Sequence, residues 1–440
     1  MTAIEIASRP MSEADHRAQL RRAVIASAVG TTIEWYDFFL YGLAAAVIFP
    51  RLFFPAHHPF VGQLLSFSTF FVGFLARPLG GVIFGYLGDR IGRKSTLVAT
   101  LLLMGLSTFL IGLLPAYEPL GVMAPILLTL LRVVQGVGVG GEWGGAVLLA
   151  VEYGHRGKRG FYASWPQAGV PLGLLASNGV LSLFQQNMDE AVFFAWGWRL
   201  PFLLSGILIA VGLGIRVRIM ETPLFMQLKE TDRLAKAPVS EVLRHHWREV
   251  LLAAGSRICE QACFYLFSIY VFSYAEKVLD IDKGIIFGGV NIAAAVEFCT
   301  IPLFGILSDH LSRKRTYVFG CLFLFAFAMP YFAILNTREP VCIQLAIVLS
   351  LAIGHAMLYS VQASLIPELF GTRLRYTGAS LGYQLASPFA GGLAPIIAVS
   401  LVEAFPNQYW PLAGYIMTIS VISLICVQLL AETSRKDITA

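Results

Sequence analysis

Long apolar runs alternate with short polar segments along almost the whole chain. A run of about 20 apolar residues, wound as a helix, matches the thickness of the hydrocarbon core of a bilayer. Twelve such runs can be marked, at about 23–48, 61–87, 95–114, 121–147, 160–184, 197–217, 250–275, 285–307, 316–336, 341–364, 378–402 and 410–431. The pattern predicts an all-α membrane protein with twelve transmembrane helices.

Composition supports this prediction. The chain has 440 residues, of which 57% are hydrophobic and only 13% charged, and its mean hydropathy is +0.70. A soluble protein of this length could not bury so much apolar surface. The first 20 residues are polar and have no apolar signal core, so we expect no cleaved leader. The six cysteines form no C-x-x-C pair, and we expect free thiols and no metal site.

The distribution of basic residues predicts the orientation. If the N-terminus is cytoplasmic, the inner loops and tails carry 24 of the 32 lysines and arginines, and only Arg51, Arg199, Lys277, Lys283 and Arg338 lie outside. This asymmetry predicts that both termini are cytoplasmic. The net charge of +5 then reflects topology and contact with anionic lipid, not nucleic acid. Three basic residues remain within the spans: Arg77, Arg132 and Arg257.

An internal repeat divides the chain into two halves. The segment GYLGDRIGRK (85–94) recurs as GILSDHLSRK (305–314), and Glu152 and Arg159 recur as Glu368 and Arg375 at nearly the same offset. We therefore predict a tail at 1–21, a six-helix bundle at 22–217, a cytoplasmic linker at 218–249, a second six-helix bundle at 250–431 and a tail at 432–440. Duplicated parallel halves suit alternating access around a central site.

Several motifs carry a family resemblance. GYLGDRIGRK between spans two and three resembles the signature of the major facilitator superfamily, and LRVVQGVGVGGEWGG (131–145) resembles the arginine motif of its proton-linked carriers. EWYDFFLYG (34–42), FLARPLGG (74–81), GWRLPF (197–202) and PELFGTRLRYTGAS (367–380) are together similar to the metabolite:proton symporter branch. RICE (257–260) with GYQLAS (382–387) looks most like the shikimate carriers. The resemblance implies two six-helix bundles and proton-driven uptake of a small metabolite, commonly a carboxylate.

Arg77 is the most unusual residue of the second span. It lies twelve residues before Asp89, about 18 Å along a helix, and so near mid-membrane, where a charge must face the interior of the bundle. A guanidinium matches a carboxylate with two parallel hydrogen bonds, so we interpret Arg77 as an anchor for a substrate carboxylate. The alternative is a permanent ion pair that locks helices together.

Glu34, Asp37 and Tyr41 share one face of the first span. Two neighbouring carboxylates in a low dielectric cannot easily both ionise, so one of them suits a transported proton. We predict that Asp37 is the proton site, and that Glu34 either adjusts the pKa of Asp37 or is itself the proton site. Glu34 could instead simply pair with an arginine.

The fourth span carries Arg132, Gln135, Val139 and Glu142 on one stripe. Arg132 and Glu142 are about 15 Å apart along the helix, so each needs a partner elsewhere. We expect Asp37 to pair with Arg132, so that protonation of Asp37 frees Arg132 for substrate. The neighbouring glycines are expected to serve mainly helix packing.

In the second half, Arg257 and Glu260 are spaced for an intrahelical ion pair or for contact with substrate. Glu297 and His355 are isolated in the sequence and are interpreted as satisfied structural groups. Further polar residues could contact substrate. Those that could bind its hydroxyl groups are Gln167, Asn178, Tyr383 and Gln384, and also Gln362, and we add Tyr41 and Gln135 as candidates for substrate binding.

Charged residues at the inner ends of the helices predict a conformational gate. Asp89 with Arg93, and Asp309 with Arg313, are expected to be cross-linked by Glu152, Arg159, Glu368 and Arg375. Such ion pairs would hold the inner face closed and break on switching. The alternative is simple anchoring by positive charge.

We therefore predict a proton-coupled symporter of the inner membrane that imports a small organic acid as a monomer, with a shikimate-like hydroxy acid as first candidate. Alternatives are α-keto or dicarboxylic acids, or a zwitterion such as betaine or proline. Betaine carriers of this family typically have a long heptad tail, whereas about ten residues follow Leu430 here. No H-E-x-x-H or Walker motif is present, so we expect no enzyme and no cofactor, with the proton gradient as energy source.

Overall fold

The computed structural model describes residues 13–55, 59–91, 93–153, 157–217, 238–371 and 374–434. Every regular element in this part of the chain is a helix. Eleven of these helices or helix groups are long and apolar enough to cross a membrane, and the 35-residue helix α2 is the twelfth long one. The predicted all-α architecture with twelve spans is confirmed.

The N-terminal half contains six spans. Its long helices are α2 (Glu13–Val47), α4 (Pro59–Ile91), α5 (Arg93–Leu113), α7 (Met123–Tyr153) and α8 (Arg159–Asn187). The sixth span is assembled from α9 (Glu190–Val192), the π-helical turn η1 (Phe193–Gly197), α10 (Arg199–Leu203) and α11 (Ser205–Val217). Two single-turn helices, α3 (Phe49–Leu52) and α6 (Tyr117–Leu120), lie in the connections.

The C-terminal half repeats this plan with more interrupted helices. Its first span combines α14 (Trp247–Tyr265), η2 (Leu266–Tyr270), α15 (Val271–Tyr274) and η3 (Ala275–Leu279). The second and third spans are the single helices α16 (Lys283–His310) and α17 (Arg313–Leu335). The fourth combines α18 (Pro340–Leu349), η4 (Ser350–His355) and α19 (Ala356–Glu368), and the fifth combines α20 (Arg375–Gln384), η5 (Pro388–Gly392) and α21 (Leu393–Ala404). The sixth is α22 (Trp410–Leu429).

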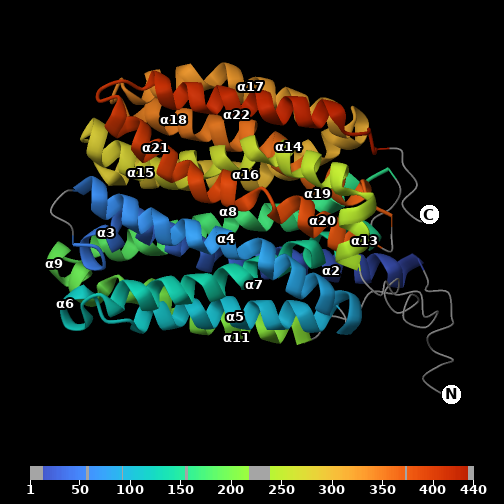
Figure 1. The fold of residues 1–440 in the computed structure, drawn as a ribbon, viewed down its shortest axis with the longest axis horizontal. Coiled ribbons are helices and arrows are strands. Elements are labelled where there is room, and N and C mark those ends of the chain that lie inside the picture. The colour runs from blue at the N-terminus through green and yellow to red at the C-terminus, as the bar shows by residue number, and fades with distance from the viewer. Residues whose placement is uncertain are drawn as a thin grey trace.

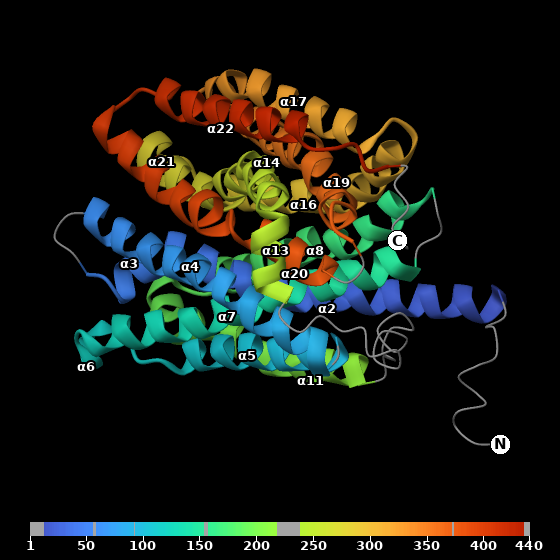
Figure 2. The same ribbon diagram turned by 45° about the vertical axis from the view of Figure 1, so that its right-hand side comes forward.

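The two halves lie side by side with their helices nearly parallel. In Figure 1 the helices of the N-terminal half, blue to green, gather on one side and those of the C-terminal half, yellow to red, on the other. The halves meet where α8 packs along α16, and where α4 packs against α20 and α21. Figure 2 shows the same division from a second direction.

The two ends of the bundle can be named by their helices. One end of the bundle holds the beginning of α2, the end of α22 and the short helix α13 (Pro238–His245), and we call it the α13 end (Figure 1). The opposite end holds α3, α6 and α9, and we call it the α3 end. Two predicted boundaries are shifted. Helix α2 begins at Glu13, well before residue 22, and the expected linker contains α13, which packs against α20 and α4, as well as the start of α14.

Close approach of α4 and α7 builds the centre of the N-terminal half. A Cβ atom added at Gly80 would strike the backbone oxygen of Val137, and one at Gly140 would strike that of Arg77. Only glycine leaves room for backbones at this separation. The packing role expected for the glycines of the fourth span is confirmed at Gly140, and it brings Arg77 and Arg132 into the same interior region.

Candidate functional site

Two arginines are buried in the N-terminal half without carboxylate partners. Arg77, near the middle of α4, and Arg132 of α7 are both 0% exposed. Among the described residues, no group in good hydrogen-bonding geometry accepts from the three guanidinium nitrogens of Arg77 or from Nε and Nη2 of Arg132; the phenol of Tyr265 interacts with Arg77 but carries no charge to balance it. The permanent ion pair considered as the alternative for Arg77 is not formed among the described residues.

Aromatic rings cover both cations. The Arg77 Cζ atom lies 4.2 Å from the ring centroids of Phe38 and Phe74, and Arg132 Cζ lies 4.1 Å from Phe38 and 4.2 Å from Tyr41. The negative faces of these rings offset part of the cost of a buried cation. They offer no hydrogen-bond acceptor equal to a carboxylate, so the guanidinium N–H groups keep their capacity to bind an anion.

Asp37 lies nearby without a cation. Its side chain is 0% exposed and accepts a hydrogen bond from Ser205 of α11. Among the described residues no basic group forms an ion pair with it, so the expected Asp37–Arg132 pair is wrong. Arg132 Nη1 donates instead to Gln135, whose Nε2 donates to the backbone oxygen of Asp37 at 3.2 Å. Gln135 thus separates the two groups that we expected to meet.

Glu34 and Glu142 share one arginine that the sequence did not reveal as a partner. Arg216 Nη2 lies 2.5 Å from Glu34 Oε1 and 3.6 Å from Glu142 Oε1, and Thr31 donates to Glu142 at 3.3 Å. Glu142 therefore has a partner on another helix, as expected. Glu34 pairs with an arginine instead of contacting Asp37. Arg216 lies in the last turn of α11, at the end of the sixth span, yet it is only 4% exposed.

A second buried charged group occupies the C-terminal half. Arg257 Nε lies 3.4 Å from Glu260 Oε2, which confirms the intrahelical pair, and Arg257 Nη1 donates to the backbone oxygen of Tyr383 at 2.6 Å. Glu260 also contacts His355, which contacts Glu297. His355 and Glu297 are therefore not isolated from each other, although both have polar partners as expected of structural groups: they extend the Arg257–Glu260 pair. The helices that carry them meet only in the folded bundle.

Most of the predicted hydroxyl-binding residues link helices in this structure. Gln167 Nε2 donates to the backbone oxygen of Tyr359 and Gln384 Nε2 to that of Gly140, both across the two halves. The ring of Tyr383 stacks on Trp143 with centroids 3.6 Å apart. Asn178 and Gln362 of this group are likewise engaged, with Asn291 at 2.6 Å and with Tyr317 at 2.7 Å. Tyr41, a further candidate for substrate contact, donates to Thr69 at 2.6 Å.

The ion pairs of the predicted gate that lie among the described residues are in the C-terminal half. Arg313 pairs with Asp309 at 2.7 Å and with Glu368 at 3.4 Å. Asp309 also accepts hydrogen bonds from the backbone N–H groups of Gly160 and Phe161 in the other half, at 2.9 and 3.0 Å. Arg159 and Arg375 are 6% and 2% exposed. The side chains of Asp89, Arg93 and Glu152 lie outside the described residues.

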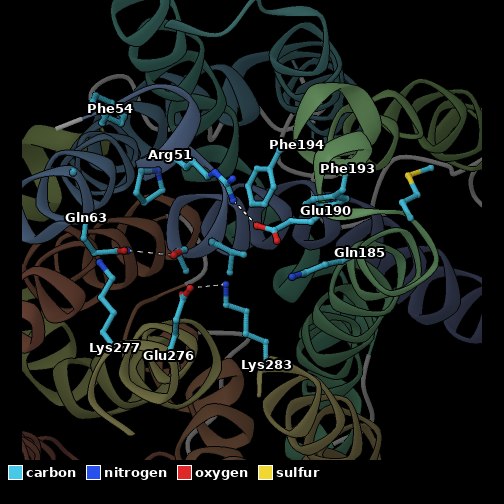
Figure 3. A pocket seen from close by; sticks show the side chains of 15 residues that line it. Arg51, Phe54, Gln63, Gln185, Glu190, Phe193, Phe194, Glu276, Lys277 and Lys283 are labelled. Carbon is cyan, nitrogen blue, oxygen red and sulfur yellow. Dashed lines mark hydrogen bonds and ion pairs between the residues drawn. The ribbon is translucent and has the colours of Figure 1, made fainter. Parts of the chain in front are cut away.

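The opposite end holds a cavity of about 580 Å³ (Figure 3). Arg51 pairs with Glu190 at 2.6 Å, and Lys283 pairs with Glu276 at 2.8 Å, so each of these ion pairs stays within one half. Gln63 and Gln185 also line this cavity, and Figure 3 shows them on opposite sides of it.

Aromatic rings separate this cavity from the buried arginines. Phe70 lies two turns, about 10 Å, deeper in α4 than the cavity-lining Gln63. Its ring contacts Tyr265 of the other half with centroids 5.6 Å apart, and Phe38 contacts Tyr265 at 6.2 Å. At the α13 end, hydrogen bonds between the two halves close the molecule. At the α3 end the cavity described above forms a vestibule between the halves.

Comparison with known proteins identifies the family. The model of the Major Facilitator Superfamily matches residues 28–395. The chain belongs to the major facilitator superfamily. This superfamily protein is a transporter and not an enzyme, and it spans the membrane many times. Among the described residues, no group of three or more His, Cys, Asp or Glu side chains could hold a metal ion.

Its relatives carry several different substrates by name. It is 38% identical to the "Shikimate transporter" of Escherichia coli (strain K12), over 98% of this chain and 99% of that transporter. It is also 38% identical to the "Glycine betaine/proline/ectoine/pipecolic acid transporter OusA" of Dickeya dadantii (strain 3937), over 96% of this chain and 85% of OusA. The proton:xylose symporter XylE has the same fold, with a TM-score of 0.72 over 96% of this chain and 98% of XylE, at 15% identity.

Proposed function

We propose that this transporter is a proton-coupled symporter that imports a small organic acid across the inner membrane by alternating access, as a monomer. The observation that carries the proposal is the pair of buried guanidiniums of Arg77 and Arg132, neither of which has a carboxylate partner among the described residues and most of whose N–H groups make no hydrogen bond there. Charge inside a membrane protein is costly and is typically retained for substrate or ion pathways. A substrate carboxylate would supply both the missing acceptors and the missing negative charge.

The proton is assigned to Asp37. A buried carboxyl group with no cation beside it has a lower free energy with a proton bound. Asp37 is in this situation, and Gln135 connects its backbone to Arg132. On this proposal the proton at Asp37 and the acid at Arg77 and Arg132 occupy one interior site, so that one conformational change moves both.

Shikimate is the first candidate substrate, with α-keto and dicarboxylic acids as alternatives. Sequence identity does not separate acids from zwitterions, because the shikimate and betaine carriers are both 38% identical to this chain. The charge of the site favours an acid. A zwitterion brings its own cation, and that cation would leave the positive charge of Arg77 and Arg132 without net compensation.

The test is uptake into proteoliposomes with an imposed inward proton gradient. The panel is shikimate, α-ketoglutarate, succinate, citrate and glycine betaine, and the variants are Arg77→Ala and Asp37→Asn, with Arg248→Gln at an exposed position outside the cavity as a surface control. We expect gradient-stimulated uptake of an acid that Arg77→Ala abolishes. Asp37→Asn should retain exchange of the acid but lose the effect of the gradient. Uptake of betaine alone, or undiminished uptake of acid by Arg77→Ala, would contradict the proposal.

A further inference from the structure

A buried imidazole in the C-terminal half lies between two glutamates from two other helices. Glu297 of α16 contacts His355 Nδ1, and Glu260 Oε1 of α14 lies 3.1 Å from His355 Nε2. The three residues are at most 3% exposed. We call Glu260, His355 and Glu297 the C-half triad. The glutamates contact opposite nitrogens of the ring, so they do not converge on a common point as metal ligands do.

The geometry of the C-half triad requires an extra proton. A neutral imidazole donates through one ring nitrogen and presents a lone pair at the other, and an ionised carboxylate only accepts. With a neutral ring, one carboxylate would face a lone pair at hydrogen-bond distance. Both contacts become hydrogen bonds when the ring carries protons on both nitrogens. The triad therefore holds one proton more than a neutral histidine with two carboxylates, and we place it on His355.

With that proton the group is electrically neutral together with Arg257. Arg257 Nε lies 3.4 Å from Glu260 Oε2, so two positive and two negative charges form one row from Arg257 to Glu297. Burial of a neutral row costs far less than burial of an unbalanced charge. Any change in the pairing of Arg257 therefore alters the charge balance of the whole row.

Few other ionisable groups face this row. Phe264 and Tyr359 cover the imidazole, with ring centroids 4.6 and 5.0 Å away. Within the described part of the chain, the other ionisable groups that interact with Glu260 or Arg257 of this row are Cys263 on α14, Tyr317 on α17, Tyr359 on α19, Tyr383 on α20, Tyr265 on α14 and Arg77 on α4. The phenols and the thiol are neutral, so Arg77 is the one further charge among these groups. It is a cation and cannot replace Arg257 as a partner without leaving its own site.

We propose that the C-half triad is a second proton-binding site, which takes up a proton when Arg257 leaves Glu260 and joins Arg77 in binding the carboxylate of the transported acid. This inference rests on the proposed function. When the acid compensates Arg257, the triad keeps one net negative charge in a medium of low dielectric. A proton from water then binds to the carboxylate of Glu260 and restores neutrality. Release of the acid reverses the step: Arg257 returns to Glu260 and the proton leaves to water.

The first test counts protons. Purified protein is titrated with shikimate in two buffers of different ionisation enthalpy, and the difference in heat gives the protons bound per shikimate. The wild type should take up about one proton more than Glu260→Gln, because an amide has no carboxylate to protonate. Asp37→Asn is the matched control in the other half and should leave this difference in place. Equal proton uptake by the wild type and Glu260→Gln would overturn the inference.

The second test needs no substrate. Protein with ¹⁵N-labelled histidine is studied by solid-state NMR at about pH 8, where an ordinary imidazole is neutral. The signals of His355 are assigned by their loss in His355→Gln. We expect both ring nitrogens of His355 to be protonated in the wild type, and one of them to lose its proton in Glu297→Gln. A neutral ring in the wild type would overturn the inference.

The two tests separate this inference from the proposed function. Gradient-driven uptake of acid combined with a neutral His355 would overturn only the inference. A doubly protonated His355 in a protein that transports no acid would support the charge assignment in the triad and contradict the proposed function.

Discussion

Arg216 of α11 pairs with Glu34 of α2 inside the bundle, with 2.5 Å between Nη2 and Oε1. The two side chains are 5% and 0% exposed. The same nitrogen lies 3.6 Å from Glu142 of α7. One guanidinium therefore joins three helices of the N-terminal half and balances part of the charge of two buried carboxylates. This places Arg216 among the residues on which the stability of this half depends.

Arg216→Gln should destabilise the protein strongly. Removal of one partner from a buried ion pair leaves the other charge uncompensated, at a cost of about 3–5 kcal/mol. The measurement is thermal unfolding in detergent, followed by tryptophan fluorescence. Arg51→Gln is the matched control, because it breaks the exposed pair with Glu190, worth about 0–1 kcal/mol. Similar unfolding temperatures for the two variants would show that the buried ion pairs of Arg216 contribute little to the stability of this half.

The sequence predicted the helices well because their main determinant is local. A span needs about 20 apolar residues, and every one of the twelve predicted runs coincides with a long helix or a helix group. The interruptions were not predicted. The π-helical turns η2, η4 and η5 lie inside three of the predicted apolar runs. They depend on packing between helices, which a linear pattern does not record.

The candidate site was predicted by residue but not by partner. Helical spacing shows which residues share a face, and so it placed Glu34 with Asp37 and Arg257 with Glu260. It does not show which helix that face meets. Arg216 pairs with Glu34 over 182 positions of sequence, and His355 meets Glu260 over 95. These contacts depend on how twelve helices rotate in the bundle, so the Asp37–Arg132 pair was predicted wrongly and the C-half triad was missed.

Trp143→Ala should weaken closure at the α13 end. The rings of Trp143 and Tyr383 stack across the two halves with planes 10° apart, and an aromatic pair contributes about 0.5–1.5 kcal/mol beyond its buried area. Loss of this contact shifts the protein toward conformations in which the halves separate there. The measurement is the labelling rate of Ser380→Cys, a buried position beside Gly144, in a background without the six native cysteines.

We expect labelling of Ser380→Cys to be several-fold faster with Trp143→Ala, and close to the starting rate with Trp143→Phe, which can still stack. An unchanged rate in Trp143→Ala would mean that the hydrogen bonds between the halves hold this end closed without the aromatic pair.

Gly80→Ala should be destabilising although it adds a single methyl group. The new Cβ would collide with the backbone oxygen of Val137, and backbone of a packed helix cannot turn aside as a side chain does. Overpacking of this kind costs about 1–3 kcal/mol. Gly179→Ala is the same substitution at a helical position with no atom within 4 Å of the new Cβ. Thermal unfolding should show a lower midpoint for Gly80→Ala and an unchanged or higher one for Gly179→Ala, since alanine favours the helix. The reverse order would refute close backbone contact between α4 and α7.

Glu432 ties the segment after α22 to the gate, and its effect on stability should depend on pH. Its carboxylate accepts hydrogen bonds from the backbone N–H groups of Arg313 at 3.2 Å and Lys314 at 3.1 Å, at the beginning of α17. Partial burial raises the pKa of Glu432, but hydrogen bonds from the backbone N–H groups of Ser434 and Lys314 outweigh it, so this pKa lies below its ordinary value of 4.5. Thr433 extends the contact by donating to Glu368 at 2.6 Å.

A carboxyl group whose pKa is lower in the folded state stabilises that state above its unfolded pKa. The contribution disappears as pH falls through the folded value. Glu432→Gln should therefore unfold at a lower temperature than the wild type near neutral pH, and the difference should shrink as pH falls below 4.5. The control is Glu403→Gln, an exposed residue near the end of α21, which should change the midpoint little at any pH. A difference for Glu432→Gln that stays constant, or grows toward acid pH, would mean that the carboxylate charge does not stabilise the start of α17. The segment after α22 would then contribute to the gate through Thr433 and its bond to Glu368 alone.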